Sequence, residues 1–178
     1  MRVIAALLSL LLLACPAMAS AQSFELHGSA GPTLVDTGYS LAAGIGFSPA
    51  SHVTVGLDVE RTHLASQLRT DGRGGLVGSR GGTLTLVAPQ LRVTLFGHNR
   101  VGPYGLAGFA AGVSTPKVNE LFPERVTNDV RAIFFGGGVH VPFNERLSLI
   151  IDGRMIIGGE AGELLAVAPI RAGVIWRF

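Results

Sequence analysis

Apolar side chains recur at every second position along most of this chain, and this spacing is the strongest constraint on its fold. In 52–64, for example, Val53, Val55, Leu57 and Val59 are separated mainly by polar or charged residues. A period of two is that of a β-strand whose faces meet different surroundings, and no helical period is sustained after residue 21. The pattern predicts eight strands, over 24–34, 41–48, 52–64, 82–96, 102–114, 129–141, 147–157 and 164–178.

In the last predicted strand, the apolar face opposes Arg171 and Arg177. Its members are Ala166, Ala168, Ile170, Ala172, Val174, Trp176 and Phe178. An apolar face points inward in a soluble barrel, whereas in a membrane barrel it points outward to lipid and the polar face fills the lumen. The strand over 102–114 is too rich in Gly and Ala for its two faces to be assigned.

The low charge content helps to choose between these two kinds of barrel. Only 15% of the residues are charged, whereas soluble domains usually carry about 25%. A helical membrane protein needs apolar runs of roughly 20 residues, and charges, glycines or prolines interrupt every such stretch beyond residue 21. Membrane barrels spread their apolar surface over many short strands, because only alternate residues touch lipid. The composition therefore favours a membrane barrel.

The first 21 residues have the pattern of a secretory signal peptide. A positive start is followed by an apolar run that ends at Pro16, and a small-x-small site precedes Gln22. Cleavage there predicts a mature barrel domain over 22–178, whose nearly balanced charge does not suggest nucleic acid as a partner. Two alternatives stay open, a membrane anchor over the same residues and lipoprotein processing at Cys15, the only cysteine.

Short and long connections between the predicted strands alternate along the chain. The second, fourth and sixth connections are the short ones, over 49–51, 97–101 and 142–146, and the long ones over 65–81 and 115–128 are odd-numbered. An up-and-down barrel places alternate connections at opposite ends. Outer-membrane barrels have short periplasmic turns and longer extracellular loops. We therefore expect a protein of the cell outer membrane with both termini in the periplasm.

Most aromatic residues fall at or near the predicted periplasmic ends of the strands. They are Phe24, Phe47, Phe96, Tyr104, Phe143, Trp176 and Phe178. Aromatic rings favour the boundary between hydrocarbon and water, so these residues predict an aromatic belt on that side of the membrane. Tyr39, Phe122 and Phe134 lie toward the other end and predict a thinner second belt.

A β-sheet in lipid must close, because each unpaired edge N–H or C=O group costs several kcal/mol. Strand 24–34 is therefore expected to pair with strand 164–178. The predicted fold is all-β, an eight-stranded antiparallel up-and-down transmembrane β-barrel. Eight strands enclose an interior just wide enough for side chains to fill it, which predicts a plugged lumen and leaves no room for a wide pore.

Several segments, in this order and spacing, carry a family resemblance across 22–178. They are Gly102-Pro103-Tyr104-Gly105, Gly136-Gly137-Gly138-Val139, Asn144-Glu145-Arg146-Leu147-Ser148-Leu149 with Asp152 and Arg154, and the terminal Trp176-Arg177-Phe178. With these features the chain resembles the small outer-membrane β-barrel family of the OmpA-barrel, OmpX and OmpW type. The resemblance implies that Trp176 and Phe178 form a signal for the barrel-assembly machinery. It does not settle activity, because the family is functionally diverse.

Nine polar residues are expected to form a network in the lumen, because an isolated buried charge is very costly and must be paired or hydrated. They are Glu25, His27, Asp58, Glu60, Arg92, His140, Asp152, Arg154 and Arg171. The first interpretation of this set is a structural plug that fills the barrel. The alternative is a narrow ion path through the plug.

The segment His27-Gly28-Ser29 raises an enzymatic alternative. The family includes lipid A deacylases with a His-x-Ser-Asn motif on a late strand, and their His and Ser act on the lipid-facing wall. Here the pair lies in the first strand and Ala30 takes the place of Asn, so no catalytic residue is assigned. No metal-ligand cluster, nucleotide loop or thiol site is visible, and no cofactor is expected.

The connection 65–81 holds Arg69, Arg73 and Arg80 against Asp71. Guanidinium groups bind phosphates in bidentate fashion, so these arginines are candidate contacts to lipopolysaccharide; a solvated loop is the alternative. The predicted function is a structural or surface-interaction role, with outer-membrane lipid and lipopolysaccharide as partners and the assembly machinery during biogenesis. A monomer is favoured. An enzyme that modifies lipid A or phospholipid and a narrow channel remain the alternatives.

Overall fold

The computed structural model describes residues 22–34, 37–65, 69–70, 76–77, 81–117, 127–160 and 163–178. No helix in these ranges is long and apolar enough to cross a membrane. The strands are β1 (Ser23–Thr33), β2 (Gly38–Ala50), β3 (Val53–Leu64), β4 (Arg69–Thr70), β5 (Leu76–Val77), β6 (Gly82–Thr94), β7 (Gly102–Pro116), β8 (Asn128–Pro142), β9 (Leu147–Glu160), β10 (Glu163–Val167) and β11 (Ile170–Arg177). The predicted signal peptide with Cys15, and also Arg73, Arg80 and Phe122, lie outside the described residues.

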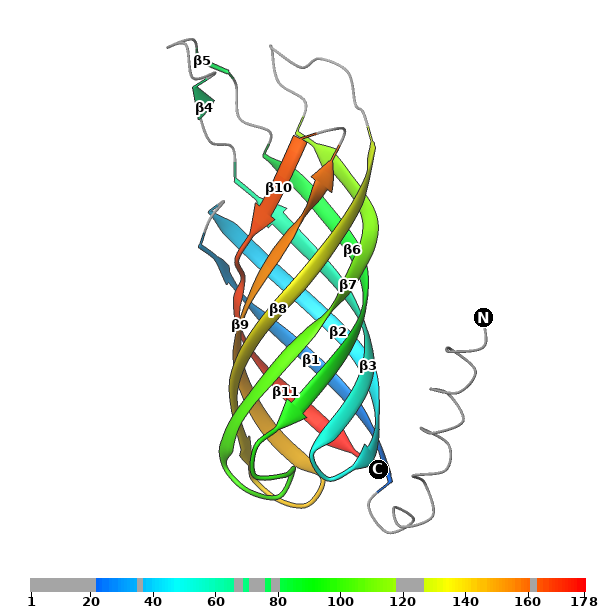
Figure 1. Cartoon of the computed structure of the whole chain (residues 1–178). Coiled ribbons are helices and arrows are strands. Elements are labelled where there is room, and N and C mark those ends of the chain that lie inside the picture. The colour runs from blue at the N-terminus through cyan, green and yellow to red at the C-terminus, as the bar shows by residue number, and fades with distance from the viewer. Residues whose placement is uncertain are drawn as a thin grey trace, which may run out of the picture.

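The long strands form one closed antiparallel barrel (Figure 1). Each long strand pairs with the next in the sequence, and the barrel closes where β1 pairs with β11. Strands β10 and β11 both pair with β9 and together occupy one position in the wall. The predicted eight-stranded up-and-down barrel is therefore confirmed, including the pairing of the first strand with the last. Strands β4 and β5 pair only with each other, within the connection predicted over 65–81.

The strand predicted over 164–178 is divided at Ala168 and Pro169. Proline has no N–H to donate, so it interrupts the ladder of hydrogen bonds. At the break, the Leu34 N–H donates to the Ala168 carbonyl at 2.9 Å and the Arg154 N–H donates to the Pro169 carbonyl at 3.1 Å. The inside–outside alternation also slips, because Val167, Ala168 and Pro169 are all buried. Ala168 was therefore wrongly assigned to the outward apolar face.

Three strands extend at least two residues beyond their predicted bounds. Strand β2 begins at Gly38 rather than at 41, β7 ends at Pro116 rather than at 114, and β9 ends at Glu160 rather than at 157. Glycine and proline weaken the strand signal in a sequence, but a neighbouring strand still offers N–H and C=O partners. The backbone continues the ladder where such partners are available.

The barrel has a turn end and a loop end. We call the turn end the one with the short connections β2–β3, β6–β7 and β8–β9 together with Ser23 and Phe178, and the loop end the opposite one (Figure 1). In the β8–β9 turn the Asn144 side chain accepts hydrogen bonds from the N–H groups of Arg146 and Leu147, at 2.9 and 2.7 Å. In the β6–β7 turn Gly97 has a φ of 78°, a conformation that other residues adopt at a cost. These features end the strands sharply.

The outer wall of the barrel is apolar from the turn end to near the loop end. Alternate residues of β3 are typical: Val55, Leu57 and Val59 are all exposed. Five predicted belt aromatics are exposed near the turn end, namely Phe24, Phe96, Phe143, Trp176 and Phe178. Two others were wrongly assigned to belts, because Tyr104 and Phe134 point inward and are buried.

The interior has two different halves. Toward the turn end charged and polar side chains predominate, although Leu106, Ile150 and Ile175 are also buried there. Toward the loop end apolar side chains predominate, and Thr62 and Ser114 are also buried there. This apolar filling does not follow from the alternation of faces. The apolar residues of both ends belong to one buried cluster, which includes Leu64, Leu84, Leu86, Val130, Phe134, Ile156, Leu165 and Val167.

Candidate functional site: the barrel interior

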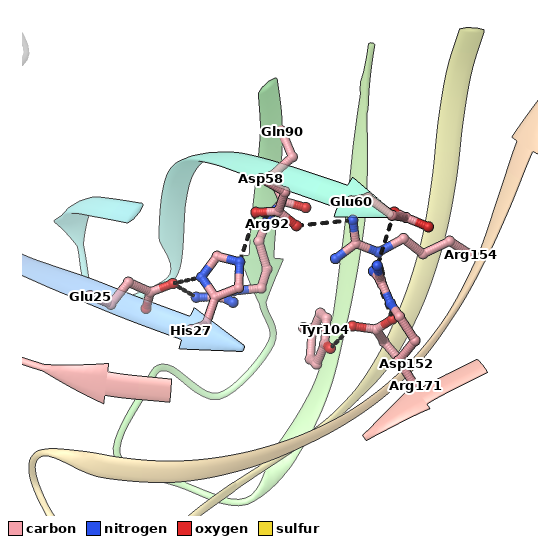
Figure 2. A network of polar contacts seen from close by, with 10 residues as sticks. All are labelled: Glu25, His27, Asp58, Glu60, Gln90, Arg92, Tyr104, Asp152, Arg154 and Arg171. Carbon is pink, nitrogen blue, oxygen red and sulfur yellow. Dashed lines mark hydrogen bonds and ion pairs between the residues drawn. The ribbon is translucent and has the colours of Figure 1, made fainter. Parts of the chain in front are cut away.

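All nine residues predicted for the lumen are buried inside the barrel. They come from β1, β3, β6, β8, β9 and β11, so only closure of the wall brings them together. Figure 2 shows eight of them with Gln90 and Tyr104, joined in one network of polar contacts. Three groups make up this network, and each is centred on one or two carboxylates.

The first group surrounds Glu25 on β1. Its carboxylate accepts a hydrogen bond from Arg92 of β6. Arg177, which pairs with Glu25 across the β1–β11 seam, places its Nε 3.6 Å from the second carboxylate oxygen. His27 lies two residues along β1 and places its Nδ1 3.9 Å from Glu25. One carboxylate therefore joins three strands of the wall at the point where the barrel closes.

The second group surrounds Asp58 on β3. One carboxylate oxygen accepts from His27 Nε2 at 2.7 Å and from Gln90 Nε2 at 2.8 Å. The other oxygen lies 3.2 Å from Nη1 of Arg154, which reaches across from β9. Because both oxygens have partners and the side chain is fully buried, Asp58 connects the first group to the third.

The third group joins Asp152 and Glu60 through Arg171. Arg171 donates to Glu60 at 2.9 Å and to Asp152 at 3.4 Å. Asp152 also lies 3.5 Å from the Nε of Arg154 and accepts from the Tyr104 hydroxyl at 3.1 Å. The hydroxyls of Ser40 and Thr62 donate to the remaining oxygen of Glu60 at 2.9 and 3.2 Å.

The buried charges balance among the described residues. The buried carboxylates are Glu25, Asp58, Glu60 and Asp152, and the buried guanidinium groups are Arg92, Arg154, Arg171 and Arg177. Each carboxylate lies within ion-pair distance of at least one arginine. Pairing of this kind offsets the desolvation of the charges, and loss of one partner leaves a buried charge uncompensated.

Glycines in the wall make room for these side chains. A Cβ added to Gly44 of β2 would lie 2.8 Å from His27 Nε2 and would also press on Asp58. A Cβ on Gly46 would lie 2.8 Å from the Cγ of Glu25. Gly136 and Gly138 of β8 pair with Arg154 and Asp152, but a Cβ on either would first meet the backbone of β9, at the carbonyls of Gly153 and Ile151. Gly44 and Gly46 therefore leave room for large charged residues inside a narrow barrel.

Histidines and Arg177 line the turn end of the interior. Arg177 donates to His140 Nε2 at 3.0 Å, to the Ser148 hydroxyl at 3.2 Å and to the His98 carbonyl at 3.3 Å. The His98 and His140 rings meet edge to face, with centroids 6.4 Å apart. Below them a cavity of about 490 Å³ opens at the turn end, and Arg177 forms part of its wall.

His98, in the β6–β7 turn, makes stability depend on pH. Burial, and secondly the charge of Arg177, lowers its pKa from 6.5 to about 4. As the pH falls from 6.5 to 4 the unfolded chain gains a proton there and the folded chain does not, so folding loses at most about 3 kcal/mol. We expect His98→Gln to reduce the loss of unfolding free energy over this interval, measured by urea titration at pH 7 and pH 4. Equal losses in both proteins would contradict the assignment.

The His27–Ser29 pair does not lie where a lipid-modifying enzyme needs it. Both side chains are buried inside the barrel, and His27 is held by Asp58. The outward-facing positions of this part of β1 are Leu26, Gly28 and Ala30 instead. Within the described ranges no group of three or more His, Cys, Asp or Glu side chains could hold a metal ion.

Some members of the network are not among the residues predicted from sequence. The prediction puts Arg177 opposite the apolar face of the last strand without including it in the lumen network, and it puts Tyr104 in a belt. Gln90 and His98 are not predicted as site residues. The alternation of Arg177 with Trp176 and Phe178 is a sufficient signal for its inward direction. Tyr104 lies in the Gly- and Ala-rich strand, where apolar alternation gives no direction. The side chain of Arg69, a predicted lipopolysaccharide contact, lies outside what the structure describes.

No family model and no curated protein matches the sequence. Solved structures do match. The N-terminal β-barrel domain of Pseudomonas aeruginosa OprF covers 89% of this chain and 98% of its own length, with a TM-score of 0.65 and 14% identity. Neisserial surface protein A covers 88% of this chain and 97% of its own length, with a TM-score of 0.67 and 12% identity. A major outer membrane protein of Thermus thermophilus covers 89% of this chain and 100% of its own length, with a TM-score of 0.53 and 16% identity. The chain therefore has the fold of the small eight-stranded barrels found among outer-membrane proteins.

Proposed function

We propose that the protein is an integral outer-membrane barrel with a structural or surface-interaction role and a lumen closed to solute. The observation that carries the proposal is that the barrel reverses the arrangement of soluble proteins, in which apolar side chains lie inside and charged side chains lie outside. Large apolar side chains cover the outer wall, whereas the charged side chains lie inside. A wall of this extent in water would be an exposed apolar patch far larger than soluble monomers carry. Lipid is the surrounding that such a wall fits.

Two successive layers support a closed lumen. The charged network fills the turn half, and its carboxylates and guanidinium groups are engaged with each other. The apolar cluster around Leu84, Leu86 and Ile156 fills the loop half, where each of these side chains is 1% exposed. An ion on this route would have to displace paired charges and then pass a layer in which apolar side chains predominate, where it would lose most of its hydration.

Conductance in planar bilayers tests the closed lumen. We expect the purified, refolded protein to insert without stable current steps, while a general porin gives steps in the same bilayers. Large and stable steps would overturn the closed lumen and favour the channel alternative. That result would leave the outer-membrane location intact, because the location depends on the outer wall.

Fractionation of the cell envelope tests the location. We expect the protein in the outer-membrane fraction, with Gln22 as its first residue. Recovery in the soluble periplasm would overturn the proposed location. A blocked N-terminus at an acylated Cys15 would instead favour the lipoprotein alternative.

Lipid and lipopolysaccharide of the outer membrane are the proposed partners of the monomeric barrel, with the assembly machinery as a transient partner. For the long connection the proposal keeps Arg69, Arg73 and Arg80 as candidate contacts to lipopolysaccharide phosphates. Their guanidinium groups match phosphate chemistry. A deletion strain compared with its parent for detergent sensitivity and lipid A composition would separate a surface role from an enzymatic one. Altered lipid A acylation would favour the enzyme.

A further inference from the structure

Three polar side chains interrupt the apolar outer wall near the loop end of β2 and β3. They are Tyr39, Arg61 and His63, and all three are exposed. On β3 the outward positions run from Val55, Leu57 and Val59 directly to Arg61 and His63. Tyr39 stands opposite His63 in the β2–β3 ladder. We call these three residues the wall patch.

The geometry of the wall patch leaves its donors available. The Tyr39 and His63 rings pack against each other with centroids 5.3 Å apart and planes tilted by 32°. Leu41, an exposed apolar residue, stands opposite Arg61 on β2. Among the described residues Arg61 has no hydrogen-bond or ion-pair partner, in contrast to the four buried arginines. Within the described part of the chain, no carboxylate therefore neutralises the guanidinium of Arg61.

The position of Arg61 along β3 indicates its depth in the bilayer. An arginine on the lipid face of a barrel costs about 2–4 kcal/mol at the middle of the bilayer and about 0–1 kcal/mol near the interface. Arg61 lies three residues before the loop end of β3 at Leu64. Arg61 is the ninth residue of β3, and a tilted strand crosses the hydrocarbon core in about 9–11 residues. Arg61 therefore falls where the apolar wall ends and lipid head groups begin.

The geometry points to the wall patch as a binding site for the phosphate of an outer-leaflet lipid, with lipid A as the lipid that carries it. This inference rests on the outer-membrane location proposed above. A guanidinium presents several N–H donors in a fork that fits two phosphate oxygens. The Tyr39 hydroxyl and the His63 ring are further donors beside it. The phosphate would neutralise the one charge of the patch, and the site is separate from the arginines of the long connection.

Arg131 on β8 provides a matched comparison. It is also an exposed arginine on the outer wall, three residues from the loop end of its strand at Asn128. Its flanking outward residues are Asp129 and Ile133, so it has a carboxylate and no aromatic donor beside it on the same face. The comparison separates the effect of the wall patch from that of any outward positive charge.

The test measures thermal stability of the full mature barrel in vesicles. The protein is refolded in phosphatidylcholine vesicles and in the same vesicles containing lipid A, and the melting temperature is read from loss of the heat-modifiable folded band. We expect lipid A to raise the melting temperature of the native protein. Arg61→Gln should lose most of that rise, whereas Arg61→Lys should keep part of it and Arg131→Gln nearly all of it.

Four results would overturn the inference. In the first two, lipid A raises the melting temperature of Arg61→Gln as much as that of the native protein, or Arg61→Gln and Arg131→Gln lose this increase equally. In the other two, lipid A does not raise the melting temperature of the native protein, or inorganic phosphate raises it in phosphatidylcholine vesicles. The last would assign the patch to free phosphate rather than to a lipid. Because every measurement uses barrels already in vesicles, none depends on the cellular location. If the proposed outer-membrane location is wrong, the envelope fractionation will show it instead.

Discussion

Replacement of Arg154 by alanine is expected to lower the free energy of unfolding by about 3–5 kcal/mol, the usual cost of breaking a buried ion pair from one side. Arg154 lies 3.2 Å from Asp58 and 3.5 Å from Asp152, and both carboxylates are buried. The substitution leaves Asp58 with His27 and Gln90 alone and leaves Asp152 with Arg171 and Tyr104. The lumen then carries a net negative charge.

Urea titration of the refolded barrel in vesicles measures this effect. Arg131→Ala is the control, because it removes an outward guanidinium without leaving a buried carboxylate unpaired, and it should change the unfolding free energy by less than about 1 kcal/mol. The double variant Arg154→Met with Asp58→Asn should recover part of the loss, because it removes a charge of each sign and retains most of the volume. A loss in Arg154→Ala no larger than in Arg131→Ala would falsify the proposed plug.

Replacement of Phe178 by alanine is expected to reduce the folded protein in cells far more than the stability of the purified barrel. The Phe178 ring is exposed on the outer wall, and its N–H donates to the Phe24 carbonyl at 2.9 Å, a backbone contact that alanine retains. Loss of one boundary aromatic should cost at most a few kcal/mol. Loss of an assembly signal would instead slow insertion and leave the chain in the periplasm.

Two measurements separate the effects of Phe178→Ala. The heat-modifiable folded band in cell envelopes should fall strongly, and the purified variant should still refold in detergent. Phe143→Ala is the matched control, because Phe143 is an equally exposed aromatic at the turn end that lies in the β8–β9 turn rather than in the last strand. If both variants insert at native levels, Phe178 is not an assembly signal.

Substitutions in the lumen network and substitutions on the outer wall should differ in whether their effects on stability add. Substitutions inside the lumen disturb groups that share partners, so their effects on stability should not be additive. Substitutions on the wall replace one lipid contact by another and should act separately. The wall patch is the exception that we propose, because there a polar side chain replaces an apolar one at the level of the head groups.

The sequence determined the strands and their order. For each strongly alternating strand it also determined which face is apolar and which is polar. A period of two specifies which residues share a face, whatever surrounds the barrel. The low charge, and the alternation of short and long connections, favoured the apolar face as the outer one. The nine lumen residues were predicted because charged side chains occupied alternate positions opposite runs of valine, leucine or isoleucine. Closure followed from the cost of unpaired edges in lipid.

Only the tertiary structure decided what fills the interior at each level. Tyr104 lies among glycines and alanines, whose small side chains satisfy either face, so its inward direction depends on the register with β8. Leu84 and Leu86 are apolar and still point inward, where they belong to the buried apolar cluster. The partners of Asp58 are 31 to 96 residues away in the chain. Alternation gives the direction of a side chain from its strand, but tilt and register of the closed wall decide which side chains it meets.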